Sequence, residues 1–330
     1  MALDLQAGCV CVGLTNVANH KLKDKLEMLD ASAGRMAAKS SDKALKLLLM
    51  PEFFGSLYDN DIRTFRPLSD ADRKALLDRA AEISQKHSWI VIPGTVLIPV
   101  SGVPEQGAFT KANGRVQSCV PVFYKGALIA RFFKKFYSTG EIPCVPRMKD
   151  DGKWPVATPL MGAFDTEKLR AASEQVREKL VPDMFTVEGH DFGLEICNDI
   201  GMLSTVLGSR RGPGCHIIVS QGMSLGYIYN QAVAKYIDRD GAVIGKTVAK
   251  LPEAESINQG AIGYEGVFVQ CDGPASRCAT KELFGHWRLH LATDLLALEP
   301  LAKAKGGYGG IPSCFVLYPP VPLSKFTLTT

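Results

Sequence analysis

The sequence lacks any apolar run of the roughly 18–20 residues that a membrane-spanning helix requires. Its first residues, MALDLQAG, contain no basic segment and carry Asp4 early, so no signal peptide is expected. No internal repeat or low-complexity linker divides the 330 residues. We therefore expect a single large domain over residues 1–330, located in the cytoplasm.

The sequence also lacks a cluster of basic charge. The formal net charge is only +4, and the lysines and arginines are scattered along the chain. Arg210-Arg211 and Lys134-Lys135 are pairs and do not form a patch. Nucleic acid is therefore not expected as a partner.

Cysteine is present without any regular spacing. Nine cysteines are an odd number, and their local contexts are unrelated. This pattern suits a reducing compartment, in which most cysteines are small buried hydrophobic residues.

Two short segments match a ligand-binding motif only in part. His286 and His290 have the i, i+4 spacing of helical zinc ligands, but no glutamate follows the first histidine, so a pair on one helix face is favoured over a metal site. The segment GAVIGKT, residues 241–247, is one residue short of a phosphate-binding loop and is better interpreted as a hairpin turn with a strand after it. Neither metal nor nucleotide is predicted.

Short aliphatic runs alternate with amphipathic segments along the chain. This alternation predicts a mixed sheet covered by helices. Proline and charge are frequent at about 142–160, where a surface loop leading to a helix near 165–180 is expected. A C-terminal extension or arm is expected from about 300. The expected helices are 20–38 and 70–86, the expected strands are 9–17, 44–50, 89–100 and 215–222, and two hairpins are expected to turn at Lys125-Gly126 and Glu188-Gly189.

Three apolar segments each end in one reactive side chain. These are Glu52 in LKLLLMPEFFG, Lys134 in GALIARFFKKFYSTGE and Cys197 in DFGLEICNDIG. A carboxylate, an ammonium and a thiol are the groups needed to make a cysteine nucleophile that attacks an electrophilic carbon. Taken singly, each has a simpler interpretation: a turn carboxylate, a solvated lysine and a core cysteine.

The context of Cys197 favours a nucleophile. The residues that follow it, Asn198, Asp199 and Gly201, are polar or flexible, so the thiol is expected where a strand breaks into a turn. Such a turn exposes the thiol and frees backbone N–H groups that can bind an oxyanion.

Glu52 and Lys134 suit the supporting roles. Glu52 lies between an apolar strand and Phe53-Phe54, and an apolar environment makes a carboxylate a competent proton acceptor for a thiol. Because side chains alternate along a strand, one of Lys134 and Lys135 should point inward, and spacing alone does not decide which.

The three motifs, in this order, resemble the nitrilase superfamily of carbon–nitrogen hydrolases, whose catalytic triad is Glu–Lys–Cys. MPEFFG matches the family's Pro-Glu-aromatic motif at Glu52, and GLEICNDIG matches its nucleophile strand at Cys197. The family's catalytic lysine lies eight residues after a hairpin glycine, which from Gly126 gives Lys134. By order and spacing the match covers roughly residues 5–225.

The resemblance implies a mixed α/β fold, specifically a four-layer α-β-β-α sandwich, and a homo-oligomer. It implies that Glu52 is the base, that Cys197 is the nucleophile, and that Lys134 stabilises the oxyanion together with the N–H of Asn198. No cofactor and no metal are required. The resemblance further implies that Glu141, seven residues after Lys134, assists catalysis, and that Phe53 and Ile200 contribute to the substrate or oxyanion site.

The chain departs from the family pattern in two places. The segment between Lys134 and Cys197 is longer than is usual in the family, so an insertion is expected at about 142–185. The other departure follows the nucleophile. Members with Cys-Asn-Asp often continue with arginines that hold a substrate carboxylate, whereas Ile200-Gly201 stand here, and Arg210 or Arg211 could substitute. Nitrile-hydrolysing members usually carry Cys-Trp-Glu. We therefore expect cleavage of a small, uncharged amide. A nitrilase, an N-carbamoyl hydrolase, acyl transfer to an amine and a catalytically silent binding scaffold are the alternatives.

Overall fold

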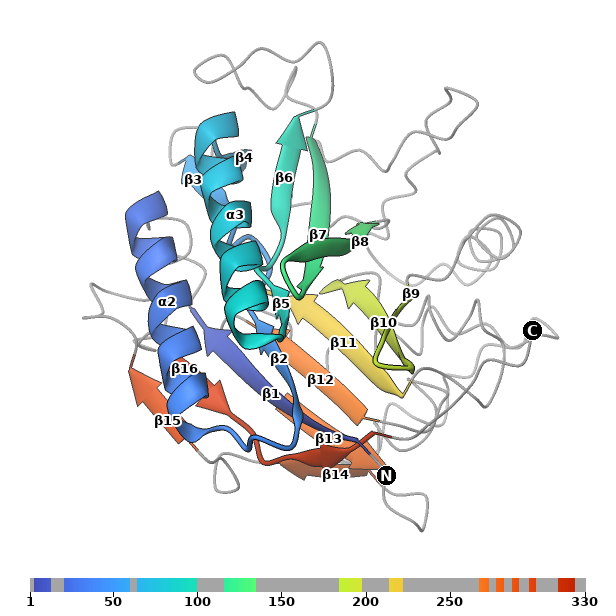
Figure 1. Ribbon diagram of the computed structural model, residues 1–330. Helices are drawn as coiled ribbons and strands as arrows, with labels where there is room; N and C mark the ends of the chain where they lie inside the picture. The colour runs from blue at the N-terminus through green and yellow to red at the C-terminus, as the bar shows by residue number, and fades with distance from the viewer. Residues whose placement is uncertain are drawn as a thin grey trace, which may run out of the picture.

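The structure is a computed structural model, and the residues that it describes form two large β-sheets and two helices (Figure 1). A further two-stranded sheet joins β3 (Ser56–Asp59) to β4 (Thr64–Pro67). The residues that it describes are 3–12, 21–59, 64–99, 116–134, 184–197, 214–221, 267–272, 277–281, 287–290, 297–300 and 314–323.

The first sheet has nine strands, with a main path β15-β16-β1-β2-β5-β7-β6, while β17 pairs with β1 and β8 pairs with β7. Strands β1, β2 and β5 run parallel, and they are the apolar runs of the N-terminal part of the chain, as is typical of strands covered on both faces. The strands are β1 (Asp4–Cys11), β2 (Leu45–Leu49), β5 (Ile90–Ile92), β6 (Val96–Pro99), β7 (Val116–Tyr124), β8 (Ala127–Phe133), β15 (Ala297–Pro300), β16 (Cys314–Leu317) and β17 (Val321–Pro322).

The second sheet has six strands in the order β14-β13-β12-β11-β10-β9. Its three central strands, β10, β11 and β12, are parallel, so their carboxyl ends meet at one edge of the sheet. The strands are β9 (Met184–Val187), β10 (His190–Ile196), β11 (Cys215–Ser220), β12 (Val267–Asp272), β13 (Arg277–Lys281) and β14 (Trp287–His290).

Helices α2 (Leu22–Lys39) and α3 (Asp70–His87) lie side by side on the outer face of the first sheet (Figure 1). Ser69 caps α3 by accepting a hydrogen bond from the Asp72 N–H, and the helix has an acidic first turn and a basic last turn, which suits its dipole. Neither of these helices, the two in the described part of the chain, is long and apolar enough to cross a membrane.

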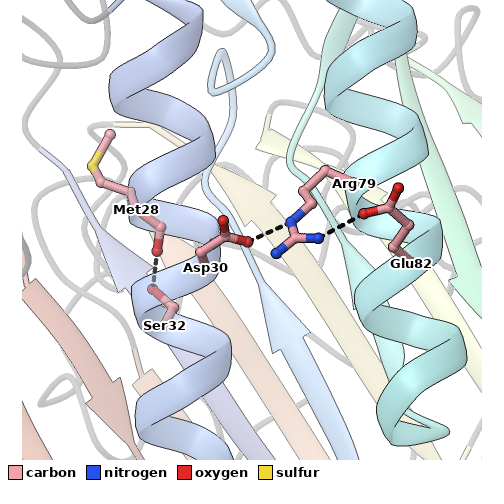
Figure 2. Close-up of polar contacts among 5 residues, drawn as sticks. All are labelled: Met28, Asp30, Ser32, Arg79 and Glu82. Atoms are coloured by element: carbon pink, nitrogen blue, oxygen red, sulfur yellow. Dashed lines mark hydrogen bonds and ion pairs between the residues drawn. The ribbon is translucent and has the colours of Figure 1, made fainter.

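An ion-pair bridge joins the two helices. The Arg79 guanidinium donates to Asp30 of α2 and to Glu82 of its own helix, both at 2.6 Å (Figure 2). The groove between the helices, about 380 Å³ in volume, is lined by these charged side chains, which already satisfy one another. The groove lies on the side of the first sheet away from the second sheet, so it is separate from the site described below.

Apolar side chains fill two layers. One cluster lies between the two sheets and joins residues such as Leu47 and Leu49 to Leu194 and Ile217. The other lies between the first sheet and the helices. These packing layers confirm the predicted mixed α/β fold and form three layers, α-β-β, of the predicted sandwich. A second helical layer stays a prediction, because both helices of the described residues lie on the first sheet.

Both predicted hairpin turns are confirmed. Lys125 and Gly126 have φ values of 50° and 82°, and Glu188 and Gly189 have 50° and 73°, the left-handed pairs of a tight two-residue hairpin. The Lys125 ammonium lies 2.8 Å from the Glu188 carboxylate, so the two turns join the two sheets at their surface.

Two expectations need correction. His290 lies in strand β14, opposite Cys278 of β13, so the prediction of a helix face for His286 and His290 is wrong. Single-sequence spacing could not show the strand pairing that competes with a short helix. The first strand begins at Asp4, earlier than expected, and residues 13–17 of the predicted strand fall outside the described ranges.

The C-terminal segment contributes to the first sheet. Strands β16 and β17 pair antiparallel with β1, and the Tyr318 N–H donates to the Ala7 carbonyl at 3.0 Å. The predicted extension from about 300 therefore includes strands that cover one side of β1. The division of the chain into one domain with an insertion at about 142–185 stays a prediction, because residues 142–183 are outside the described ranges.

A lysine is fully buried under the first turn of α2. The Lys25 side chain is 0% exposed, and its ammonium lies 5.4 Å from the centre of the Phe54 ring. Burial lowers the pKa of Lys25 from 10.5 to about 7, and the neighbouring Asp24 offsets this only in part. The folded protein therefore releases the Lys25 proton more readily than the unfolded chain does.

This pKa difference predicts a pH-dependent stability. Because the unfolded chain binds the proton more tightly, the free energy of unfolding should rise between pH 7 and 10.5. Lys25→Met removes the ionisable group, so the variant should lack this part of the rise and be more stable near neutral pH by on the order of 2–4 kcal/mol. Urea unfolding of both proteins at pH 7 and pH 9.5 measures the difference; parallel pH profiles would contradict it.

Candidate active site

Glu52 lies in a tight turn directly after β2. The turn is anchored to both sheets, because the Glu52 N–H donates to the Ser220 carbonyl at 3.2 Å and the Phe53 N–H donates to the Thr95 hydroxyl at 2.7 Å. Phe53 has a φ of 62°, which is uncommon for a bulky residue and is maintained here by these bonds. The Glu52 side chain is 0% exposed.

Lys134 is the first residue after β8, and its side chain points inward. Its N–H donates to the Ser118 carbonyl at 2.9 Å, which continues the pairing of β8 with β7. Its ammonium lies 2.7 Å from Glu52 Oε1, and it is also 0% exposed. The structure thus brings together two residues that are 82 positions apart in the sequence. Lys135, the alternative, is outside the described residues.

The pair of Glu52 and Lys134 is unusual because both charges are removed from water. Burial of a carboxylate and an ammonium costs several kcal/mol each unless they neutralise one another at close range. The Lys134 ammonium also lies 5.9 Å from the centre of the Phe53 ring, whose face attracts a cation. Buried charged pairs of this kind are frequent at functional sites, so the pair is a candidate for a site of chemistry.

Cys197 follows β10 at the edge where the parallel strands end. Ile196 is opposite Val219 of β11, so the next residues, Cys197 and Ser220, end adjacent strands, which lie about 4.8 Å apart. Ser220 is the residue whose carbonyl binds the Glu52 N–H. The backbone of Glu52 therefore meets the second sheet one strand away from Cys197.

The conformation of Cys197 is strained. Its φ is 46°, and few residues other than glycine adopt this left-handed region unless their surroundings impose it. Such strain costs on the order of 1–3 kcal/mol, and it is a feature that active sites share with tight turns. Cys197 is 8% exposed and belongs to the apolar cluster between the two sheets.

Of the other predicted site residues, the structure describes only Phe53. Phe53 is 5% exposed and stacks on Phe65 with ring centres 3.9 Å apart, next to the buried pair. Asn198, Ile200 and Glu141 lie outside the described residues, so their roles stay predictions.

Sequence reasoning missed residues that support the site. Thr95 and Ser220 anchor the Glu52 turn, although neither belongs to a motif. Glu195 and His216, on adjacent strands of the second sheet, lie 2.8 Å apart and are almost fully buried, two residues before Cys197 and four before Ser220. Glu195 alternates with the apolar residues of GLEIC, but no signal in the sequence links it to His216. Among the described residues no group of three His, Cys, Asp or Glu side chains could hold a metal ion.

Gly94 provides a test of how tightly the Glu52 turn is held. Its φ is 76°, and a Cβ there would lie 2.2 Å from the carbonyl oxygen of Pro51. Gly94→Ala should therefore lower the free energy of unfolding by more than about 2 kcal/mol, because backbone strain and the overlap add.

Gly189→Ala is the matched control for Gly94→Ala. Gly189 has a similar φ of 73° but nothing within 4 Å of an added Cβ, so it should show the conformational cost alone. Equal losses in urea unfolding of the two variants would contradict the tight packing of Gly94 against Pro51.

Comparison with known proteins is informative at the level of structure only. No family model matches the chain, and no curated protein matches its sequence. The crystal structure of an amidase from Nesterenkonia sp. is similar over 98% of this chain and 92% of its own, with a TM-score of 0.51 and 12% sequence identity. A mutant of the nitrilase-superfamily amidase from Nesterenkonia AN1 is similar over 96% and 91%, with a TM-score of 0.50 and 12% identity. This chain has the nitrilase-superfamily fold.

A third similar structure shows a reaction at its own active-site cysteine. A mutant of the amidase from Nesterenkonia sp. AN1 shows covalent addition of the acetamide moiety of fluoroacetamide at its active-site cysteine. It is similar over 97% of this chain and 90% of its own, with a TM-score of 0.51 and 12% identity. The fold of this chain agrees with the resemblance of its three motifs to the nitrilase superfamily.

Proposed function

We propose that the protein is a carbon–nitrogen hydrolase that cleaves a small, uncharged amide through a thioester on Cys197. The observation that carries this proposal is the fully buried pair of Glu52 and Lys134, 2.7 Å apart. The Glu52 N–H also binds the carbonyl of Ser220, which ends the strand next to the one that leads to Cys197. A nucleophile, a base and an oxyanion-stabilising cation are the groups that acyl transfer requires.

The proposed reaction has two halves. Glu52 takes the Cys197 proton as Sγ attacks the amide carbon, and Lys134 stabilises the negative charge that develops on the amide oxygen. The tetrahedral intermediate collapses when Glu52 returns the proton to the leaving nitrogen, which releases ammonia or an amine and leaves a thioester. Glu52 then removes a proton from water as the water attacks the thioester, and the acid and the free thiol are released.

Three residues outside the described ranges also have roles in the proposed reaction. The Asn198 N–H would support the oxyanion, Glu141 would orient Lys134 or the substrate, and Ile200 would line the site with Phe53. An apolar residue at 200 offers nothing to a substrate carboxylate, which favours an uncharged amide over an N-carbamoyl amino acid. The neighbouring amidases provide candidate substrates, because one is in complex with butyramide. We further propose a homo-oligomer in the cytoplasm with no metal or organic cofactor.

A substrate screen tests the function. The purified protein is incubated with short aliphatic amides, including butyramide, and with the matching nitriles and N-carbamoyl compounds, and ammonia and acid are measured together. Equal release of ammonia and acid from amides is the expected result. Turnover of nitriles alone would assign a nitrilase. An N-substituted amide formed with an added amine, or a hydroxamate formed with added hydroxylamine, would assign a transferase, and no turnover of any member would favour a binding scaffold.

A further inference from the structure

Four cysteines from three strands meet in the core between the two sheets, on the side away from β10. Cys9 and Cys11 of β1 and Cys271 of β12 are buried in the same cluster, and Cys314 of β16 packs against it. We call these four residues the thiol cluster. The Cys271 thiol contacts the carbonyls of Val10 and Leu49, each at 3.5 Å, so the cluster spans the interface of the sheets.

Within the thiol cluster, Cys11 and Cys314 are direct cross-strand partners. They face each other in the antiparallel register of β1 and β16, and their thiols are hydrogen-bonded to one another. Opposed residues of an antiparallel pair have Cα atoms about 4.5–5.5 Å apart, inside the range of about 4.4–6.8 Å that a disulfide spans. Both thiols are reduced in this structure.

We propose that Cys11 and Cys314 form a reversible disulfide on exposure to a low-molecular-weight disulfide such as oxidised glutathione. The bond would connect the first strand of the chain to one of its last and close nearly the whole chain into a loop. In a reducing compartment it would form only under oxidative conditions and would be reversed by excess thiol.

The two cysteines differ in ways that suit this reaction. Cys314 is the partly exposed member of the thiol cluster, so a reagent reaches it first, whereas Cys11 is buried beside it. The hydrogen bond from Cys11 lowers the pKa of Cys314 below the usual value of a thiol, although partial burial opposes the shift. A lower pKa places more of Cys314 in the reactive thiolate form. Burial raises the pKa of Cys271 well above the usual range, so that thiol is expected to be inert.

The reaction balances in two exchange steps. The Cys314 thiolate attacks one sulfur of oxidised glutathione, which forms a mixed disulfide and releases one glutathione thiolate. The Cys11 thiolate then attacks the Cys314 sulfur, which forms the Cys11–Cys314 disulfide and releases the second glutathione. Two protein thiols are oxidised, one glutathione disulfide is reduced to two thiols, and the two protein protons go to the two leaving thiolates.

Hydrogen bonds link the Cys11–Cys314 pair to the edge of the sheets at which the candidate active site lies. Val12 follows Cys11, and its carbonyl accepts a hydrogen bond from the Gln221 side chain at 3.0 Å. Gln221 follows Ser220, whose carbonyl binds the Glu52 N–H. A disulfide at Cys11 would therefore fix β16 to the strand that leads to this edge. The proposal itself is independent of the catalytic activity.

The experiment treats the native full-length chain with oxidised glutathione, blocks remaining thiols, and maps disulfide-linked peptides by mass spectrometry before and after dithiothreitol. The expected product joins the Cys11 and Cys314 peptides and raises the Tm by about 5 °C or more, because the closed loop is very long. Dithiothreitol should reverse both changes. The Tm readout needs no substrate, so its result does not depend on the proposed function.

Two variants make the result specific. Cys314→Ser should abolish the linked peptide and the Tm increase, and Cys11→Ser should leave only the glutathione adduct on Cys314. Cys9→Ala is the matched control, since Cys9 lies two residues from Cys11 on the same buried face, and it should retain both effects. A stable glutathione adduct in the wild type without the Cys11–Cys314 link, a link between Cys9 and Cys271, or no reaction at Cys314 would each overturn the proposal.

Discussion

Cys197→Ala is expected to reduce amide turnover by at least about 10⁴-fold while the protein remains folded. The thiol is the only atom of the proposed site that forms a bond to the substrate, so the remaining groups can bind and polarise the amide but cannot form the thioester. Turnover is measured with the best amide from the substrate screen, and folding is measured by circular dichroism and urea unfolding.

The control for Cys197→Ala is another buried cysteine of the second sheet. Cys215 begins β11 opposite Phe192, at the other end of the strand from Ser220, and it is 0% exposed. Cys215→Ala removes the same atom from the same core and should retain turnover. Undiminished hydrolysis by Cys197→Ala, or an equal loss in both variants, would contradict the role of Cys197 as nucleophile.

Lys134→Met is expected to lower the free energy of unfolding by about 3–5 kcal/mol, since it leaves the Glu52 carboxylate buried without its ammonium. Glu52→Gln should also be costly, because it removes the carboxylate that lies 2.7 Å from the buried Lys134 ammonium. The double variant should lose less than the sum of the two single losses, as groups in direct contact do not act independently. Urea unfolding of the four proteins measures this coupling.

A surface pair of the same residue types is the control. Lys125 and Glu188 lie 2.8 Å apart, but their side chains are 55% and 47% exposed, so water screens their interaction. Lys125→Met should therefore leave the free energy of unfolding nearly unchanged. If Lys134→Met were as mild as Lys125→Met, or if the two single losses simply added, Glu52 and Lys134 would not be a buried, interacting pair.

The sequence predicted the parts of the fold that depend on local signals. The left-handed turns at Lys125-Gly126 and Glu188-Gly189 and the helix after Ser69 depend on residues adjacent in the chain, and they are confirmed. The strand at His290 was missed because its partner residue, Cys278, is set by sheet pairing. The antiparallel pairing of β16 with β1 was likewise not predicted, because it joins opposite ends of the chain.

The sequence also predicted part of the candidate site, namely its motif residues. Motif order placed Glu52 and Lys134 in one site, and the structure brings them within 2.7 Å. Ser220 and Thr95, which hold the Glu52 turn, were not predicted, because a backbone carbonyl or a single hydroxyl leaves no motif. The same reason applies to Glu195 and His216, whose pairing depends on the register of β10 and β11.

The most direct test of an activated Cys197 is peptide-mapped alkylation of the native protein with limiting iodoacetamide. Buried cysteines such as Cys119, whose pKa is raised to about 12 by burial, are internal controls in the same sample. We expect Cys197 to be modified before the buried cysteines, and its rate to change in both Glu52→Gln and Lys134→Met. A Cys197 that reacts no faster than Cys119 and is unaffected by either substitution would contradict the assembled nucleophile.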